Sequence, residues 1–243
     1  APAIALAAFE ALSLHNSPKL LIQTADHYIK DLGSFGKVIA QAFQSTAPFV
    51  LFGIKPKHPE TGYGYIECGE PTGNEFLVSA FKEKPDLETA STYFNSPNYL
   101  WNSGMFVLDA QTYLETLKIF EPAIYAACYK AYLNASSDLD FKRMDCDAFE
   151  TSPSVSIDCA VMERFENLHV IPYEGDWSDV GAWEAVASLA TQDQSGNAIQ
   201  GDGLLIDSKN TLIRAESRLV TGLGLENLVV IETHDAVLVA NAK

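Results

Sequence analysis

Apolar residues in the first part of the chain alternate between short continuous runs and a helical spacing. Residues 19–23 (Lys-Leu-Leu-Ile-Gln) and 49–54 (Phe-Val-Leu-Phe-Gly-Ile) are runs typical of buried strands. Between them, five apolar residues recur at the spacing of one helix face: Phe35, Val38, Ile39, Ala42 and Phe43. This order of strand, helix and strand predicts an α/β core, in which helices cover a parallel sheet.

The middle of the chain continues the same pattern. Helical spacing recurs over residues 112–120, 122–133, 156–163 and 183–189. Residues 168–172 form another short apolar run and predict a strand. We therefore expect one Rossmann-like core over residues 1–191.

The pattern changes from about Gln192 onward. Short apolar runs, such as Leu204-Leu205-Ile206 and Leu228-Val229-Val230-Ile231, recur there every seven to nine residues or so, with polar or glycine breaks between them. Regular short strands of this kind predict a small all-β segment over residues 192–243, either a meander or the first coils of a β-helix.

Composition narrows the class of protein. At 243 residues and 47% hydrophobic content the chain can bury a substantial core, and its net charge of -16 argues against nucleic acid or an anionic membrane surface as the main partner. No apolar run approaches the roughly 20 residues that span a bilayer, and no basic segment precedes the first apolar stretch, so we expect a cytoplasmic protein. The apolar start, Ala1-Pro2-Ala3-Ile4, predicts a buried helix and a natural protein that extends upstream.

Three short sequence motifs, at residues 62–66, 81–85 and 100–106, contain the candidate ligand-binding residues. Gly62 and Gly64 would let a ligand approach the backbone closely. Glu83 could accept hydrogen bonds from sugar hydroxyls, while the ammonium of Lys84 suits a phosphate oxygen and the amide of Asn102 can both donate and accept. We call these five residues the wall, and they predict one side of a sugar-phosphate site.

Each wall residue also has a plainer interpretation. Gly62 and Gly64 could be turn glycines, Glu83 and Lys84 an exposed ion pair of the common kind, and Asn102 a turn cap. Trp101, with Met105 and Phe106, fits a hydrophobic core better than a stacking surface. The prediction of a sugar-phosphate site therefore depends on whether these five residues lie close together in the folded chain.

Asp26 and Asp179 are the candidate metal ligands. Each follows an apolar run that predicts a strand, and ligands of open α/β sheets bind beyond the carboxyl ends of strands. Two converging carboxylates would suit a hard divalent cation such as Mg²⁺. The alternative for each aspartate alone is a turn or helix-cap residue.

Five motifs in order make the chain resemble bacterial mannose-1-phosphate guanylyltransferases. They are Ala25-Asp26-His27, Pro59-Glu60-Thr61-Gly62-Tyr63-Gly64-Tyr65-Ile66, Phe81-Lys82-Glu83-Lys84-Pro85, Tyr99-Leu100-Trp101-Asn102-Ser103-Gly104-Met105-Phe106 and Trp177-Ser178-Asp179-Val180-Gly181. Ser156-Ile157-Asp158, Gly196-Asn197 and the segment from Asp235 to Ala240 match later parts of the same family. The similarity covers essentially the whole chain.

The resemblance implies a nucleotidyltransferase core with a β-helical tail, and formation of GDP-mannose and pyrophosphate from GTP and mannose 1-phosphate. It implies that Asp26 and Asp179 hold Mg²⁺ and that Lys84 holds the sugar phosphate. Gly62 and Gly64 would present backbone to the mannose, whose hydroxyls Glu83 and Asn102 would bind. These roles make Asp26, Lys84 and Asp179 the catalytic candidates, in an enzyme of polysaccharide biosynthesis.

The family's glycine-rich triphosphate loop would precede Ala1, so two alternatives stay open. One is a non-catalytic subunit that binds a nucleotide sugar, and the other is a transferase that uses another sugar 1-phosphate or another nucleotide. A homodimer also stays open, as does an isomerase domain beyond residue 243.

Overall fold

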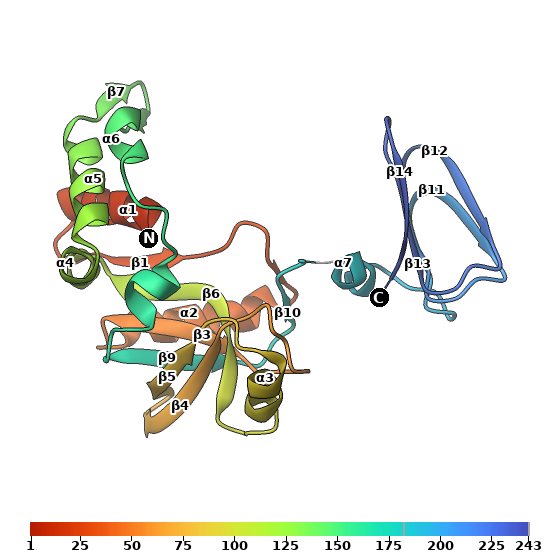
Figure 1. The fold of residues 1–243 in the computed structure, drawn as a ribbon, viewed down its shortest axis with the longest axis horizontal. Helices are drawn as coiled ribbons and strands as arrows, with labels where there is room; N and C mark the ends of the chain where they lie inside the picture. The colour runs from red at the N-terminus through yellow and green to blue at the C-terminus, as the bar shows by residue number, and fades with distance from the viewer. Residues whose placement is uncertain (182, 243) are drawn as a thin grey trace. The chain divides into compact units, whose positions relative to one another are not determined.

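The computed structural model describes residues 1–181 and 183–242. They form two compact units (Figure 1). The first comprises Ala1–Ala25 and Ile29–Trp177, and the second comprises Asp26–Tyr28 and the chain from Ser178 onward. This division falls after Trp177, before the change of sequence pattern at Gln192, and the short segment Asp26–Tyr28 belongs to the second unit.

A six-stranded sheet lies at the centre of the first unit, in the order β1-β6-β3-β9-β5-β4. Its strands are β1 (Lys19–Ile22), β3 (Phe49–Ile54), β4 (Tyr65–Thr72), β5 (Glu75–Lys82), β6 (Tyr99–Asp109) and β9 (Leu168–Tyr173). β3 is parallel to β9, whereas β6 lies between β1 and β3 and is antiparallel to both. The predicted parallel strands are present, but the sheet is mixed because β6 separates two of them.

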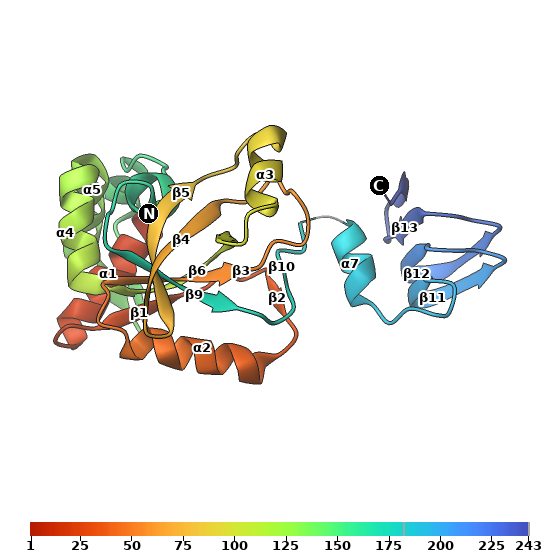
Figure 2. The same cartoon turned by 90° about the horizontal axis from the view of Figure 1, so that it is seen from below.

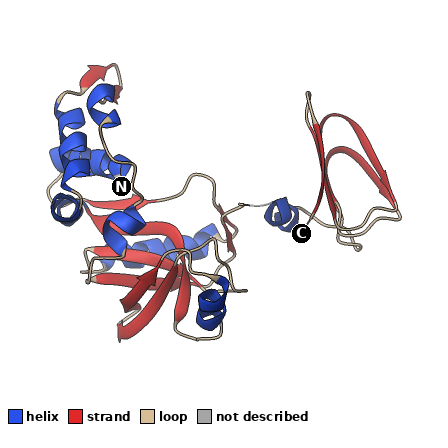
Figure 3. Ribbon diagram, viewed as in Figure 1, coloured by secondary structure: helices blue, strands red, loops and turns tan. Residues whose placement is uncertain are grey.

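Helices cover both faces of this sheet (Figures 2 and 3). α2 (Leu32–Gln44) and α3 (Leu87–Phe94) pack on one face. The other face is covered by α1 (Pro2–Leu14), α4 (Ala110–Phe120), α5 (Pro122–Leu133) and a π-helix, η1 (Asp158–Met162). β3 is buried along its whole length, as its apolar sequence predicts for a strand covered on both sides.

Aspartates start several of these helices. The side chains of Asp31, Asp86 and Asp109 each accept a hydrogen bond from a backbone N–H in the first turn of α2, α3 and α4. Asp145 does the same for α6 (Cys146–Glu150), beside the small hairpin of β7 (Ser136–Asp138) and β8 (Phe141–Arg143). Trp101, Met105 and Phe106 are all buried, which confirms their core assignment.

The second unit contains a stack of β-strands: β11 (Ala198–Ile206), β12 (Leu212–Leu223), β13 (Leu228–Glu232) and β14 (Val237–Asn241). β11, β12 and β13 pair in parallel, and β14 closes the stack antiparallel to β13. α7 (Trp183–Leu189) contributes Val186 to the small core under the stack. Because β11, β12 and β13 pair in parallel, this segment has the strand arrangement of β-helix coils and not that of a meander.

A two-stranded ribbon, β2 (Tyr28–Ile29) with β10 (Trp177–Ser178), completes the described elements. None of the helices within residues 1–181 and 183–242 is long and apolar enough to cross a bilayer.

Glu232 ties a corner of β12 to the end of β13. Its fully buried carboxylate accepts hydrogen bonds from the backbone N–H groups of Glu216 (3.0 Å) and Ser217 (2.9 Å), from the Ser217 hydroxyl and from Arg218 Nε (2.8 Å). These donors, the Ser217 hydroxyl first, lower the pKa of Glu232 to about 2. The ionised carboxylate therefore stabilises the fold above its ordinary pKa of 4.5, and this contribution is lost as the pH falls through about 2.

Glu232→Gln should loosen this corner, because an amide nitrogen would face donors that need an acceptor. We expect amide hydrogen exchange at residues 216–218 to accelerate about tenfold or more at neutral pH. Peptide-level exchange measured by mass spectrometry checks this, with the exposed Glu226→Gln as the control. Equal protection in both variants would contradict the structural role.

Candidate functional site

Three of the five wall residues converge in the first unit. Gly64 is buried directly against the other two: a Cβ added there would lie 2.6 Å from Glu83 Oε2 and 3.3 Å from Asn102 Cβ. The backbone N–H of Asn102 donates to the Gly64 carbonyl at 2.8 Å. Gly64, Glu83 and Asn102, which lie on or beside β4, β5 and β6, thus form one continuous surface, and a side chain at position 64 would displace the Glu83 carboxylate.

Gly62 lies at the exposed start of this region. Its backbone N–H donates to Glu60 Oε1 at 2.8 Å, which is a contact within a local turn. The role assigned to Gly62 by the resemblance stays a prediction.

Lys84 has an unusual backbone. Its φ is +43°, in the left-handed region that non-glycine residues rarely adopt, and it precedes Pro85. Such a conformation costs on the order of 1 kcal/mol and persists only where the surroundings enforce it. The Lys84 ammonium lies 3.7 Å from Glu83 Oε1, with 63% of its side chain exposed, so it is available to an anionic ligand.

Asp158 is a further carboxylate at the wall, and the sequence reasoning gave it no role. Its Oδ1 accepts a hydrogen bond from Asn102 Nδ2 at 3.0 Å, across 56 residues of sequence. The segment 156–163 was predicted as an ordinary helix, whereas it contains η1, which starts at Asp158. Spacing offered no signal for this contact, because it depends on how η1 packs against β6.

The pKa values of Glu83 and Asp158 are both raised, chiefly by burial. Burial is the main cause for Glu83, followed by the negative charge of Asp158, while Lys84 partly offsets both. The pKa of Asp158 is also raised, mainly by burial, although the hydrogen bond from Asn102 opposes the shift. The wall therefore holds acidic groups in a place that disfavours their charge, which is characteristic of binding and catalytic sites.

Asp26 and Asp179 belong to the second unit and flank the β2–β10 ribbon. Asp26 is exposed and lies two residues before β2, and Asp179 directly follows β10. Asp179 Oδ1 accepts the Gly181 backbone N–H at 3.3 Å. Val180 between them has a φ of +53°, which is a strained conformation for a β-branched residue.

The chemistry of this aspartate pair fits a hard divalent cation. Mg²⁺ commonly uses only one or two protein carboxylates and completes its shell with water and substrate phosphates. Within residues 1–181 and 183–242, no cluster of three or more His, Cys, Asp and Glu side chains is arranged to hold a metal. The role of Asp26 and Asp179 as metal ligands therefore stays a prediction.

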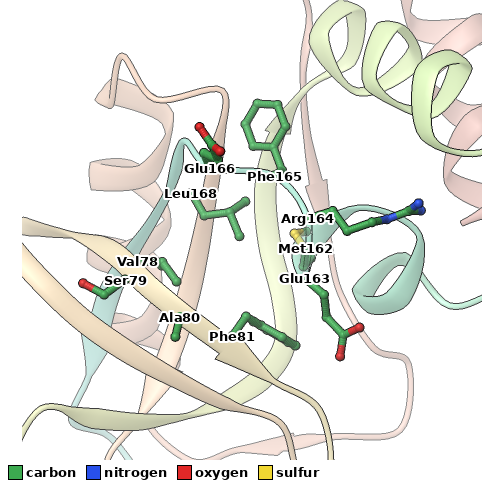
Figure 4. A pocket seen from close by; sticks show the side chains of 10 residues that line it. All are labelled: Val78, Ser79, Ala80, Phe81, Met162, Glu163, Arg164, Phe165, Glu166 and Leu168. Atoms are coloured by element: carbon green, nitrogen blue, oxygen red, sulfur yellow. The ribbon is translucent and has the colours of Figure 1, made fainter.

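A cavity of about 330 Å³ lies next to the wall, between β5 and the segment that runs from η1 into β9 (Figure 4). Residues 78–81 line one side, and the other side is lined by Met162, Glu163, Arg164, Phe165, Glu166 and Leu168. Phe81 connects the two places, since its Cζ would lie 3.3 Å from a Cβ at Gly64. None of the five wall residues lines this cavity, so the cavity is separate from the predicted sugar-phosphate site.

Comparison with known proteins assigns both parts of the chain. The nucleotidyl transferase family model matches residues 1–196, and a model described as a MannoseP isomerase/GMP-like beta-helix domain matches residues 201–243. The chain is 49% identical to Xanthan biosynthesis protein XanB of Xanthomonas campestris pv. campestris strain B100, over 99% of this chain and 52% of that protein. It is 44% identical to the mannose-1-phosphate guanylyltransferase of Escherichia coli K12, with the same coverage of both proteins. The chain spans about half the length of these curated relatives.

Solved structures agree with this fold. A Thermus thermophilus structure, titled mannose-1-phosphate geranyltransferase, matches with a TM-score of 0.86 and 30% identity, over 98% of this chain and 70% of that one. A Helicobacter pylori structure titled mannose-6-phosphate isomerase matches with a TM-score of 0.65 and 30% identity, over 73% and 69% of the two chains. Both likenesses support the predicted α/β core.

Proposed function

Because the chain belongs to the nucleotidyl transferase family, we propose that it takes part in making GDP-mannose and pyrophosphate from GTP and mannose 1-phosphate. The observation that carries this proposal is the convergence of Gly64, Glu83 and Asn102 beside Lys84. A surface with hydrogen-bonding groups for hydroxyls and an adjacent exposed ammonium matches the chemistry of a sugar 1-phosphate. The choice of guanine and mannose is supported by the named relatives.

In the proposed reaction, an oxygen of the mannose phosphate attacks the α-phosphorus of GTP. A bond forms between that oxygen and the α-phosphorus, and the bond from the α-phosphorus to the β-phosphate oxygen breaks, which releases pyrophosphate. Glu83 and Asn102 orient the sugar through its hydroxyls, Gly62 and Gly64 give it access to the backbone, and Lys84 holds its phosphate. Positioning of this kind supplies much of the acceleration in phosphoryl transfer.

Nucleotidyltransferases generally use a divalent metal, and we assign Mg²⁺ to Asp26 and Asp179. When bound there, it would neutralise phosphate charge. Both carboxylates lie next to the β2–β10 ribbon. The strained backbone of Val180, directly after Asp179, supports a functional constraint at Asp179.

The full-length natural protein should release pyrophosphate from GTP and mannose 1-phosphate in the presence of Mg²⁺. Under the same conditions ATP, UTP and dTTP should each give a kcat/KM at least about tenfold lower. A coupled pyrophosphate assay measures this, with the 243-residue chain tested in parallel. Preference for another nucleotide would overturn the guanine assignment, and GDP-mannose binding without turnover by the full-length protein would favour a sensing subunit.

A further inference from the structure

The carboxamide of Asn102 is held at both ends. Its Oδ1 accepts the backbone N–H of Gly104 at 3.2 Å, and its Nδ2 donates to Asp158 Oδ1 at 3.0 Å. A backbone N–H can only donate, and an ionised carboxylate can only accept. The two contacts therefore require the same orientation of the amide, with nitrogen toward Asp158 and oxygen toward Gly104.

Asp158 is itself fixed by its place in the fold. It starts η1, where its carbonyl accepts the backbone N–H of Glu163 at 3.0 Å. The three residues that end η1, Ala160, Val161 and Met162, are buried in the core shared with β3, β6 and β9. π-Helical turns occur frequently at functional sites. The Asp158 carboxylate is thus attached to a rigid element.

We propose that Asp158 is a positioning residue of the sugar 1-phosphate site, acting through Asn102. This inference rests on the proposed function, in which Asn102 binds a sugar hydroxyl. With Asp158 and Gly104 engaged, Asn102 keeps one Nδ2 hydrogen and one Oδ1 lone pair for the ligand, both in fixed directions. A hydroxyl can donate and accept at once, so it can use both sites.

A purely structural role for Asp158 would have different consequences. If it only fastened η1 to β6, its loss would lower the melting temperature and impair the use of both substrates together. Loss of a positioning residue should change the kinetic constants for the sugar 1-phosphate alone, because only that ligand would bind the Asn102 amide. The kinetic constants for the two substrates therefore separate these roles.

The test compares Asp158→Ala with Asp158→Asn in the full-length protein. We expect Asp158→Ala to raise the KM for mannose 1-phosphate about tenfold, with the KM for GTP and the melting temperature close to wild type. Asp158→Asn removes the charge but can still present an oxygen to Asn102 Nδ2, so it should recover most of the loss. In an Asn102→Ala background, Asp158→Ala should add nothing further. Equal effects on both substrates, or additive losses in the double variant, would overturn the proposal.

A second readout does not depend on turnover. In ¹⁵N-asparagine-labelled protein, the side-chain amide signal of Asn102, assigned by its absence in Asn102→Ala, should show slow exchange with water. Asp158→Ala should accelerate this exchange and Asp158→Asn should largely preserve it. An unchanged Asn102 signal in Asp158→Ala would overturn the positioning role. Intact positioning in a full-length protein that turns over no nucleotide would instead refute the proposed function.

Discussion

The Asp179→Asn variant of the full-length protein should lose turnover by about 10²- to 10³-fold, with its fold unchanged. The substitution keeps the size of the side chain and an oxygen that can accept the Gly181 N–H, but it removes the negative charge. A neutral amide binds a hard cation poorly, so the metal that offsets phosphate charge would be held weakly. Pyrophosphate release at saturating substrates measures the loss.

Asp176→Asn is the matched control for this variant. Asp176 lies three residues earlier and pairs with Lys30 and Lys57 at 3.9 and 3.6 Å, with 61% of its side chain exposed. Exposed pairs of this kind contribute little, so turnover should stay near wild type. Binding of Mn²⁺, followed by electron paramagnetic resonance, should weaken in Asp179→Asn only. Unchanged turnover in Asp179→Asn would refute the metal assignment.

The second large effect is expected from Glu83→Gln, which should stabilise the fold while it weakens sugar binding. Burial and the charge of Asp158 raise the pKa of Glu83, so the ionised carboxylate is a cost to the folded state. A neutral amide of the same shape avoids this cost. It also loses a charged acceptor for sugar hydroxyls, and we expect the KM for mannose 1-phosphate to rise about 10- to 100-fold.

The change in melting temperature depends on the pH. A carboxyl group whose folded-state pKa is raised destabilises the fold fully above that raised pKa and not at all below its ordinary pKa of 4.5. The melting temperature of Glu83→Gln should therefore exceed that of wild type near neutral pH, and the difference should vanish as the pH falls below 4.5. Glu88→Gln, at an exposed position in the first turn of α3, is the control and should show neither effect. A melting temperature below wild type at neutral pH would contradict the argument.

Gains of stability on removing a site residue are expected where a protein holds groups in unfavourable surroundings for function. The wall has two such features, the raised pKa of Glu83 and the left-handed backbone of Lys84. Neither could be foreseen from composition or periodicity. The raised pKa of Glu83 arises from burial and from the charge of Asp158, which lies far away in the sequence.

The sequence by itself determined the local elements and the order of the motifs. The helices at residues 112–120, 122–133 and 183–189 match α4, α5 and α7 closely, because side-chain periodicity and capping act over a few residues. The resemblance also identified Gly64, Glu83 and Asn102 as members of one site, and the structure brings these three together.

Only the tertiary structure decided which distant segments meet. It placed β6 antiparallel between β1 and β3, paired β11, β12 and β13 in parallel, and brought Asp158 to Asn102. Contacts across 56 residues depend on the packing of whole elements, which leaves no periodic trace in either segment. The sequence therefore specified the chemical groups of the site, whereas packing between elements determined the orientation in which Asn102 presents its amide.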